Sequence, residues 1–307
     1  MQEANEFTPF DQPEPLPFPF NQRTYCRFEP IEKRIESARV LVIDDLLRDE
    51  RDISERARAD WGRSVKNNLQ RERKISALAL ANILNNVSRL VREPETNVAH
   101  FSEIAEAVRE YRPQAVVLSG TLTDFDYYNP ERLEKFGEFI RETKTPVLAI
   151  CGGHQLVGMS FGARIETLDH KEQHENRVAR PYEYQYRFVR ITDPDDPIFA
   201  GIHDHESGLW QDYTTEGNIL RVWQNHGLQI DRVPDQFNLL ATSYLCRIQM
   251  MAKRAEGQLI YTVQFHLEKS FEDWDRARAT RWEHPNESRD GRIIFENFLR
   301  EALKHGQ

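Results

Sequence analysis

The chain has 307 residues, which suits one large domain or one domain with substantial insertions. Hydrophobic residues make up 39% and charged residues 30% of the chain, a balance typical of a globular protein with a charged surface. The formal net charge of -9 argues against general affinity for nucleic acids or anionic membranes, because both require an excess of Lys and Arg.

The sequence lacks the patterns of a membrane-spanning or secreted protein. No stretch approaches the roughly 20 apolar residues that span a bilayer, and the N-terminal residues lack the basic region and apolar core of a signal peptide. The three cysteines, an odd and sparse set, argue against a disulfide framework. We therefore expect a cytoplasmic protein.

Residues 1–37 differ in composition from the rest and form a Pro/Phe-rich N-terminal arm. Prolines at alternate positions within residues 13–19 forbid a helix and favour an extended strap. Either this arm packs its phenylalanines on the domain, or it docks a partner. The remainder, residues 38–307, is expected to fold as one domain.

The first part of this domain alternates strands with helices. An apolar run at 40–43 predicts a buried strand, and residues 46–92, rich in charge and helix formers, predict two helices. A further helix is expected to end before Pro113. The next is expected to begin at Asn129-Pro130, a suitable N-cap followed by proline at the first helical position.

Alternation of strands and helices predicts βαβ units and a mainly parallel sheet. From about residue 184 the pattern changes to a series of strand candidates, and an amphipathic helix over 291–303 closes the chain. The fold class is therefore α/β.

The sharpest local feature is Cys151, which lies between a buried strand, residues 146–150, and a helix that begins within two glycines. A strand-to-helix turn of this kind presents a nucleophile in elbow geometry, and the glycines tolerate its unusual backbone angles. The helix N-terminus favours a thiolate, and the N–H of Gly152 is free to face a developing oxyanion. The alternative is a buried structural cysteine beside a glycine turn.

A cysteine nucleophile needs a base, and His266 is in a suitable place among the ten histidines. It is expected to end an apolar alternating strand and is followed at i+2 by Glu268, on the same side of that strand. Glu268 would then orient the ring as the third member of a triad. A buried, hydrogen-bonded histidine is the alternative for this segment alone.

Other histidines are candidates for metal ligands. His203, His205 and Glu206 form one group, and His170 and His174 another at i, i+4 spacing. Neither has a strand or helix context that would make a site, so we predict no metal. The sequence also has no phosphate-binding loop and no dinucleotide glycine pattern, so we predict no cofactor.

The chain resembles the class I (triad-type) glutamine amidotransferase domain over roughly residues 38–304. The resemblance implies a three-layer, flavodoxin-like sandwich with a central, mostly parallel sheet. It also makes two stretches, about 46–92 and about 269–290, longer than usual in the family. Five ordered motifs carry this resemblance: AVVLSGT (115–121), AICGGHQL (149–156), WQNHGLQI (223–230), VQFHLE (263–268) and GRIIFENFL (291–299).

The resemblance implies that Cys151 attacks the side-chain amide of glutamine, that His266 moves the proton, and that Glu268 orients His266. It places the oxyanion hole at Gly120, Thr121 and Gly152, although the family usually has glycine where this chain has Thr121. The positions that match substrate contacts are Gln155, Asn225, Gly227 and Leu228.

The expected function is hydrolysis of glutamine through a cysteine thioester, with the ammonia supplied to a separate synthase subunit. One alternative is a free-standing γ-glutamyl hydrolase acting on γ-glutamyl amides or peptides. Another is a non-catalytic regulatory protein that has kept the fold, an idea motivated by Thr121. Neither a nucleic acid nor a membrane is an expected partner.

Overall fold

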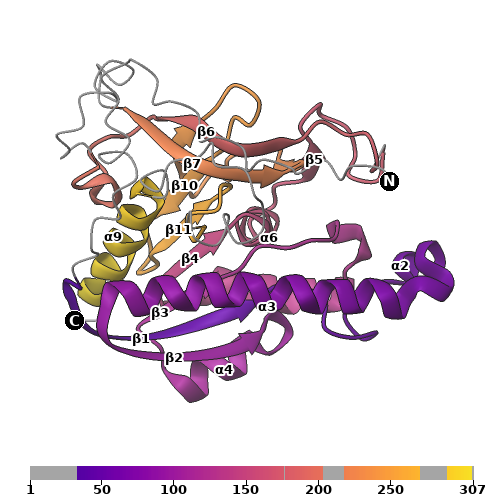
Figure 1. Ribbon diagram of the computed structural model, residues 1–307, viewed down its shortest axis with the longest axis horizontal. Coiled ribbons are helices and arrows are strands. Elements are labelled where there is room, and N and C mark those ends of the chain that lie inside the picture. The colour runs from indigo at the N-terminus through magenta and orange to yellow at the C-terminus, as the bar shows by residue number, and fades with distance from the viewer. Residues whose placement is uncertain (1–32, 176, 203–217, 270–288, 306–307) are drawn as a thin grey trace, which may run out of the picture.

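The computed structural model describes residues 33–175, 177–202, 218–269 and 289–305 (Figure 1). Across these residues, nine strands form one sheet in the order β2-β1-β3-β4-β11-β10-β9-β6-β7. Helices lie on both faces of the sheet, so the three-layer α/β fold predicted from the sequence is confirmed.

Five neighbouring strands form the parallel half of the sheet. Each pairs with its neighbour through a parallel ladder, and β3 and β4 are buried along their whole length. Full burial on both faces explains why β3 and β4 read as continuous apolar runs. They are β1 (Ile35–Asp44), β2 (Val91–His100), β3 (Ala115–Leu118), β4 (Val147–Ile150) and β11 (Ile260–Val263).

The other half of the sheet is antiparallel. It consists of β6 (Glu183–Ile191), β7 (Ile219–His226), β9 (Asn238–Thr242) and β10 (Met250–Lys253). A separate two-stranded sheet pairs β5 (Ile165–Thr167) with β8 (Leu228–Ile230). In Figure 1, β6 and β7 lie at the top, far from β1 and β2.

Two apolar clusters, one on each face, hold the helices to the sheet. The first packs the C-terminal half of α3 (Val65–Leu90) and α9 (Arg289–His305) against alternate residues of the strands. The second packs α4 (Ile104–Tyr111), α5 (Pro130–Glu142) and α6 (Gly152–Ser160) on the opposite face. The short α2 (Glu55–Trp61) precedes α3, so the stretch rich in helix formers does contain two α-helices.

Local signals set the helix ends as predicted. The Asn129 side chain caps α5 by accepting from the N–H of Glu131, and Pro130 is the first helical residue. Helix α4 ends at Tyr111, followed by Arg112 in the left-handed conformation, just before Pro113.

Strand β2 was missed by sequence reasoning. It follows α3 directly, it contains Pro94, and seven of its ten residues are exposed in succession. Proline is tolerated there because β2 is an edge strand, paired only with β1. An exposed edge strand shows neither apolar alternation nor a buried run, so the pattern gave no signal.

Several predictions fall outside the described residues. These are most of the N-terminal arm, the group His203, His205 and Glu206, and the late stretch at about 269–290 apart from its first and last residues. Among the described helices, none is long and apolar enough to cross a membrane.

Glu72 on α3 is a buried carboxyl that links this helix to the end of the sheet. One oxygen accepts from the N–H of Leu47 at 3.2 Å, and the other accepts from the hydroxyl of Thr123. Burial raises the pKa of Glu72 to about 7, against the lowering effect of those hydrogen bonds. Charging Glu72 therefore opposes folding.

We expect Glu72→Gln to stabilise the protein at pH 8. The pKa is raised in the folded state, so the cost is absent below the unfolded value, grows from about pH 4.5, and is complete above about pH 7. The amide oxygen of glutamine can accept from the N–H of Leu47 while its amide N–H donates to the hydroxyl of Thr123, so the gain at pH 8 should approach about 3 kcal/mol, at about 1.36 kcal/mol per pKa unit. Urea unfolding from pH 5 to 8 measures it. The exposed Glu93→Gln is the control, and an equal change there contradicts the assignment.

Candidate functional site

Cys151 lies in the turn between β4 and α6, at the carboxyl end of the parallel strands (Figure 1). Its backbone has φ 50 and ψ -104, a conformation that a residue with a side chain rarely adopts. The strain is held by its neighbours: the N–H of Cys151 donates to Val263 O at 2.7 Å, and that of Gly153 donates to Ser119 O at 3.1 Å. The predicted elbow is therefore present, and the thiol is 5% exposed.

The turn after β3 packs directly on the cysteine turn. A Cβ added to Gly152 would overlap Oγ1 of Thr121 and lie 2.5 Å from the backbone nitrogen of the same residue. A Cβ added to Gly120 would lie 3.3 Å from Cε1 of His266 and 3.6 Å from Cβ of Cys151. The structure thus brings Gly120, Thr121 and Gly152 together beside Cys151, and the ring of His266 lies close to Gly120.

This close approach predicts the effect of Gly152→Ala. The added methyl group must displace the Thr121 turn, so we expect a loss of about 100-fold or more in kcat, comparable to the loss of one oxyanion donor. The free energy of unfolding should also fall by about 1–3 kcal/mol, as for an overpacked site. Glutaminase assays and thermal unfolding measure both.

Gly137→Ala is the matched control, since its Cβ would meet the flexible end of Arg141 at 3.0 Å and otherwise only Ser160 at ordinary contact distances of 3.4 and 3.7 Å. Equal kinetic losses in the two variants would contradict the close-packing explanation for Gly152.

His266 and Glu268 form a pair beside Cys151. Nδ1 of His266 lies 2.7 Å from Oε1 of Glu268, and the backbone N–H of His266 donates to Trp223 O at 2.8 Å. The predicted strand is shorter than expected, because β11 ends at Val263 and His266 makes only an isolated bridge to Trp223. Glu268 therefore reaches the ring through a turn after the strand and not along one strand face.

His266 and Glu268 each stabilise the charged form of the other. Burial by itself lowers the pKa of His266, but the Glu268 carboxylate and the nearby Cys151 raise it, and the net pKa is above its usual value. Burial raises the pKa of Glu268, but His266 more than offsets this and holds it low. Within the described chain Nε2 of His266 has no hydrogen-bond partner of normal geometry, but its interaction with the nearby Cys151 contributes to the raised pKa.

The four positions expected to contact substrate gather near this pair. The amide of Gln155 donates to Leu228 O at 2.7 Å and to Oε1 of Gln264 at 3.0 Å. The amide of Gln264 in turn lies 3.7 Å from the sulfur of Cys151. This chain of contacts ties the nucleophile helix to the loop at Gly227 and Leu228.

Tyr182 was missed by sequence reasoning. Its hydroxyl donates to Oδ1 of Asn225 at 3.1 Å, and a Cβ on Gly227 would lie 2.8 Å from its ring. Partial burial and then the charge of Cys151 raise the pKa of Tyr182 to about 12. Tyr182 therefore lies over the segment Asn225–Leu228, close to Cys151. No motif in the sequence marks it.

Two arginines fix the segment that carries Tyr182. Arg180 pairs with Asp124 at 2.7 Å, and Arg177 pairs with Asp124 and, at 2.5 Å, with Asp126. Both aspartates follow the turn after β3. Residues 177–182 are therefore bound to the segment that follows Gly120 and Thr121.

The other histidines near the motifs have structural surroundings. His154 is fully buried, and burial lowers its pKa to about 3, so the ring is neutral against Oγ1 of Thr262 at 2.7 Å. His170 is exposed and its Nδ1 lies 2.5 Å from Oε1 of Glu166. His170 and His174 belong to no metal-like cluster among the described residues.

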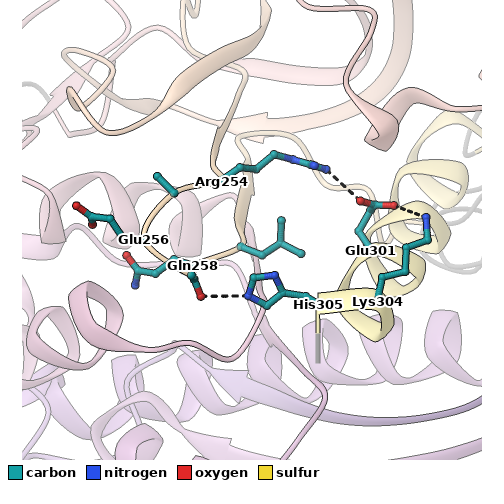
Figure 2. A pocket seen from close by; sticks show the side chains of 9 residues that line it. Arg254, Glu256, Gln258, Glu301, Lys304 and His305 are labelled. Atoms are coloured by element: carbon teal, nitrogen blue, oxygen red, sulfur yellow. Dashed lines mark hydrogen bonds and ion pairs between the residues drawn. The ribbon is translucent and has the colours of Figure 1, made fainter. Parts of the chain in front are cut away.

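A charged pocket lies elsewhere, between the β10–β11 connection and the end of α9 (Figure 2). Arg254 pairs with Glu301 at 3.3 Å, Lys304 pairs with Glu301 at 2.7 Å, and His305 contacts Gly257 O at 3.1 Å. The β10–β11 connection precedes the start of β11, whereas Cys151 follows the end of its parallel neighbour β4. The pocket is therefore at the opposite end of the sheet from Cys151.

A family model described as "Glutamine amidotransferase class-I" matches residues 79–281. The GMP synthase [glutamine-hydrolyzing] of Ralstonia pickettii is 32% identical over 64% of this chain and 32% of its own length. One GMP synthase [glutamine-hydrolyzing] subunit, from Methanothermobacter thermautotrophicus, is 28% identical over 54% of this chain and 67% of its own. The chain thus spans about a third of the first curated relatives it matches.

Solved structures agree on the fold. A putative GMP synthase subunit from Thermoplasma acidophilum has a TM-score of 0.54 at 19% identity, covering 88% of this chain and 96% of the other. A glutamine amidotransferase from Thermotoga maritima has a TM-score of 0.50 at 16% identity, covering 87% and 98%. With the family model matching most of the chain, this protein belongs to the class I glutamine amidotransferase family.

Proposed function

We propose that this protein hydrolyses the side-chain amide of glutamine and supplies the ammonia to a separate synthase. The observation that carries the proposal is the arrangement of Cys151, His266 and Glu268, with a strained nucleophile turn facing a paired histidine. Thiolate, imidazolium and carboxylate in this order are what attack on an amide carbon requires.

The reaction starts with the Cys151 sulfur attacking the amide carbon, while His266 holds the proton that came from the thiol. His266 then gives this proton to the departing nitrogen, ammonia leaves, and a γ-glutamyl thioester remains on Cys151. Water, deprotonated by His266, attacks the thioester and releases glutamate. Glu268 stays ionised throughout and keeps the ring of His266 in position.

The oxyanion is stabilised by backbone N–H groups at the junction of the two turns. The N–H of Gly152 opens α6, where the helix dipole favours negative charge. The backbone of Gly120 and Thr121 packs against the same point. Thr121 offers its own N–H where the family usually has glycine, and its side chain lies against Gly152, which has none.

The substrate glutamine is held by the segment around Asn225, Gly227 and Leu228 together with Gln155. The contacts of Gln155 and Tyr182 with this segment support the assignment, because they fix it at the mouth of the cysteine turn. We further propose that the reaction occurs in the cytoplasm, where the two described thiols, Cys151 and Cys246, stay reduced.

A separate acceptor enzyme is proposed from the relatives. The chain matches only the amidotransferase-sized part of the GMP synthases, and the Methanothermobacter thermautotrophicus relative is itself a subunit.

The test is a comparison of substrates with the purified full chain. Ammonia release should be measured with glutamine, with γ-glutamyl amides and with γ-glutamyl peptides. Glutamine as the preferred substrate, with turnover that rises when a synthase partner is added, supports the proposal. Preference for γ-glutamyl conjugates would replace it with a γ-glutamyl hydrolase, and absence of turnover with all three would leave a binding role.

A further inference from the structure

We propose that Glu183, His226 and Cys246 bind one zinc-type divalent metal ion, at a site outside the catalytic triad. One ligand atom from each residue lies within 4.8 Å of the others, and all three side chains are buried. Carboxylate, imidazole and thiolate are the ligand types that zinc selects. The sequence analysis predicted no metal.

The sheet brings these residues together from three segments. Glu183 begins β6 and His226 ends β7, and the two are directly opposite in the antiparallel ladder. Cys246 comes from the loop between β9 and β10, where Ser243 holds it: the N–H of Cys246 donates to Oγ of Ser243 at 3.2 Å. The three segments are distant in sequence, so no spacing motif announces the cluster.

The hydrogen bonds of His226 point to a cation. Its Nδ1 lies 3.0 Å from Leu228 O, an acceptor, so Nδ1 carries the proton. Its Nε2 lies 3.0 Å from both Oε2 of Glu183 and Oε1 of Gln224, which are also acceptors. Two acceptors around one ring nitrogen require a positive centre between them, either a proton or a metal ion.

The neighbours of Gln224 fix which of its two side-chain atoms, oxygen or nitrogen, faces His226. The amide of Gln249 donates to the Glu183 carboxylate at 3.0 Å, which leaves its oxygen to accept from the amide of Gln224 at 2.9 Å. The oxygen of Gln224 must then face Nε2 of His226. This chain of amides removes the usual ambiguity between nitrogen and oxygen positions.

One edge of the cluster is close to that of tetrahedral zinc, and the three ligand atoms, within 4.8 Å of one another, would draw together around the ion. The separation of 3.0 Å between Nε2 of His226 and Oε2 of Glu183 is close to the roughly 3.3 Å edge expected from usual zinc–ligand lengths. Oε1 of Gln224 is placed as a fourth donor. A carbonyl oxygen at Nδ1 is also the common partner that orients a metal-binding histidine. The metal would replace the thiol proton and the proton at Nε2.

Without a metal, the Cys246 thiol donates to Ile248 O at 3.6 Å, and binding of the ion would replace this hydrogen bond. A metal ion instead links β6, β7 and the β9–β10 loop at the base of the segment Asn225–Leu228. The site is therefore expected to be structural: it holds the proposed substrate loop and takes no part in the reaction itself.

The test uses cobalt as a spectroscopic substitute in the full chain. Protein treated with chelator, reloaded with Zn²⁺ or Co²⁺ and desalted should retain about one metal ion per chain, as expected for one closed site. The cobalt form should show a sulfur-to-metal absorption band. Cys246→Ser should lose this band, while Cys26→Ser and Cys151→Ser should keep it. This readout is independent of glutamine turnover.

Two results would overturn the proposal. Folded wild-type protein that retains no zinc or cobalt would show that Nε2 of His226 holds a proton, in an ion pair with Glu183. Loss of the cobalt band in Cys151→Ser, with retention in Cys246→Ser, would place the metal on the nucleophile. Glu183→Gln, checked by circular dichroism, should retain the fold and weaken zinc binding by about tenfold or more.

Discussion

Cys151→Ser is expected to abolish ammonia release from glutamine, with a loss in kcat of about 10⁴-fold or more. The hydroxyl of serine is a much poorer nucleophile than a thiolate, and the positive charge of His266 cannot compensate for this. Folding should survive, because the two side chains are nearly equal in size and the strained turn is held by backbone hydrogen bonds from Cys151 and Gly153.

His266→Ala should cost about as much as Cys151→Ser, and the double variant little more than either, because triad members act as a unit. Steady-state kinetics and thermal unfolding measure the three variants together. The exposed His170→Ala is the matched control and should retain wild-type turnover. Wild-type protein should also be labelled at Cys151 by a diazo-ketone analogue of glutamine. Full activity in Cys151→Ser would refute the proposed mechanism.

Glu268→Gln is the second variant with a large expected effect, a loss in kcat of about 10²- to 10⁴-fold. The amide oxygen of glutamine can still accept from Nδ1 of His266, so the ring keeps its place. The negative charge is lost, however, and with it the main interaction that raises the pKa of His266 above the effect of burial.

The pH profile distinguishes this electrostatic role from a packing role. Attack by a thiolate paired with protonated His266 fails as pH rises through the pKa of His266. Because Glu268→Gln lowers that pKa, the alkaline limb of kcat/KM should move to lower pH. Glu296→Gln is the matched control, since Glu296 is also buried and ion-paired but with Arg34 and Arg300. A profile that keeps its alkaline limb would show that Glu268 acts only through packing.

Thr121 remains the most informative departure from the family pattern. From sequence it raised the possibility of a protein without catalysis. In the structure Thr121 is accommodated because its partner in contact, Gly152, has no side chain, and the two turns meet at van der Waals limits. The expected cost of Gly152→Ala rests on this same contact, so the variant tests how far the junction tolerates bulk.

Sequence patterns correctly predicted the helix ends and the turn that depend on a few adjacent residues. The Asn129–Pro130 cap, the helix end before Pro113 and the turn at Cys151 each depend on the conformational preferences of a few adjacent residues. The pairing of His266 with Glu268 was also predicted, although the backbone between them is a turn and not a strand.

The sequence by itself thus determined the order of strands and helices except for β2, the turn at Cys151 and the three residues that we propose as the triad. Only the tertiary structure decided that Tyr182 contacts Asn225, that Arg177 and Arg180 bind the segment at Asp124, and that Cys246 meets Glu183 and His226. The physical reason is that such contacts depend on strand order and register across the sheet. Backbone hydrogen bonds fix these between distant segments, and they leave no periodic trace in the chain.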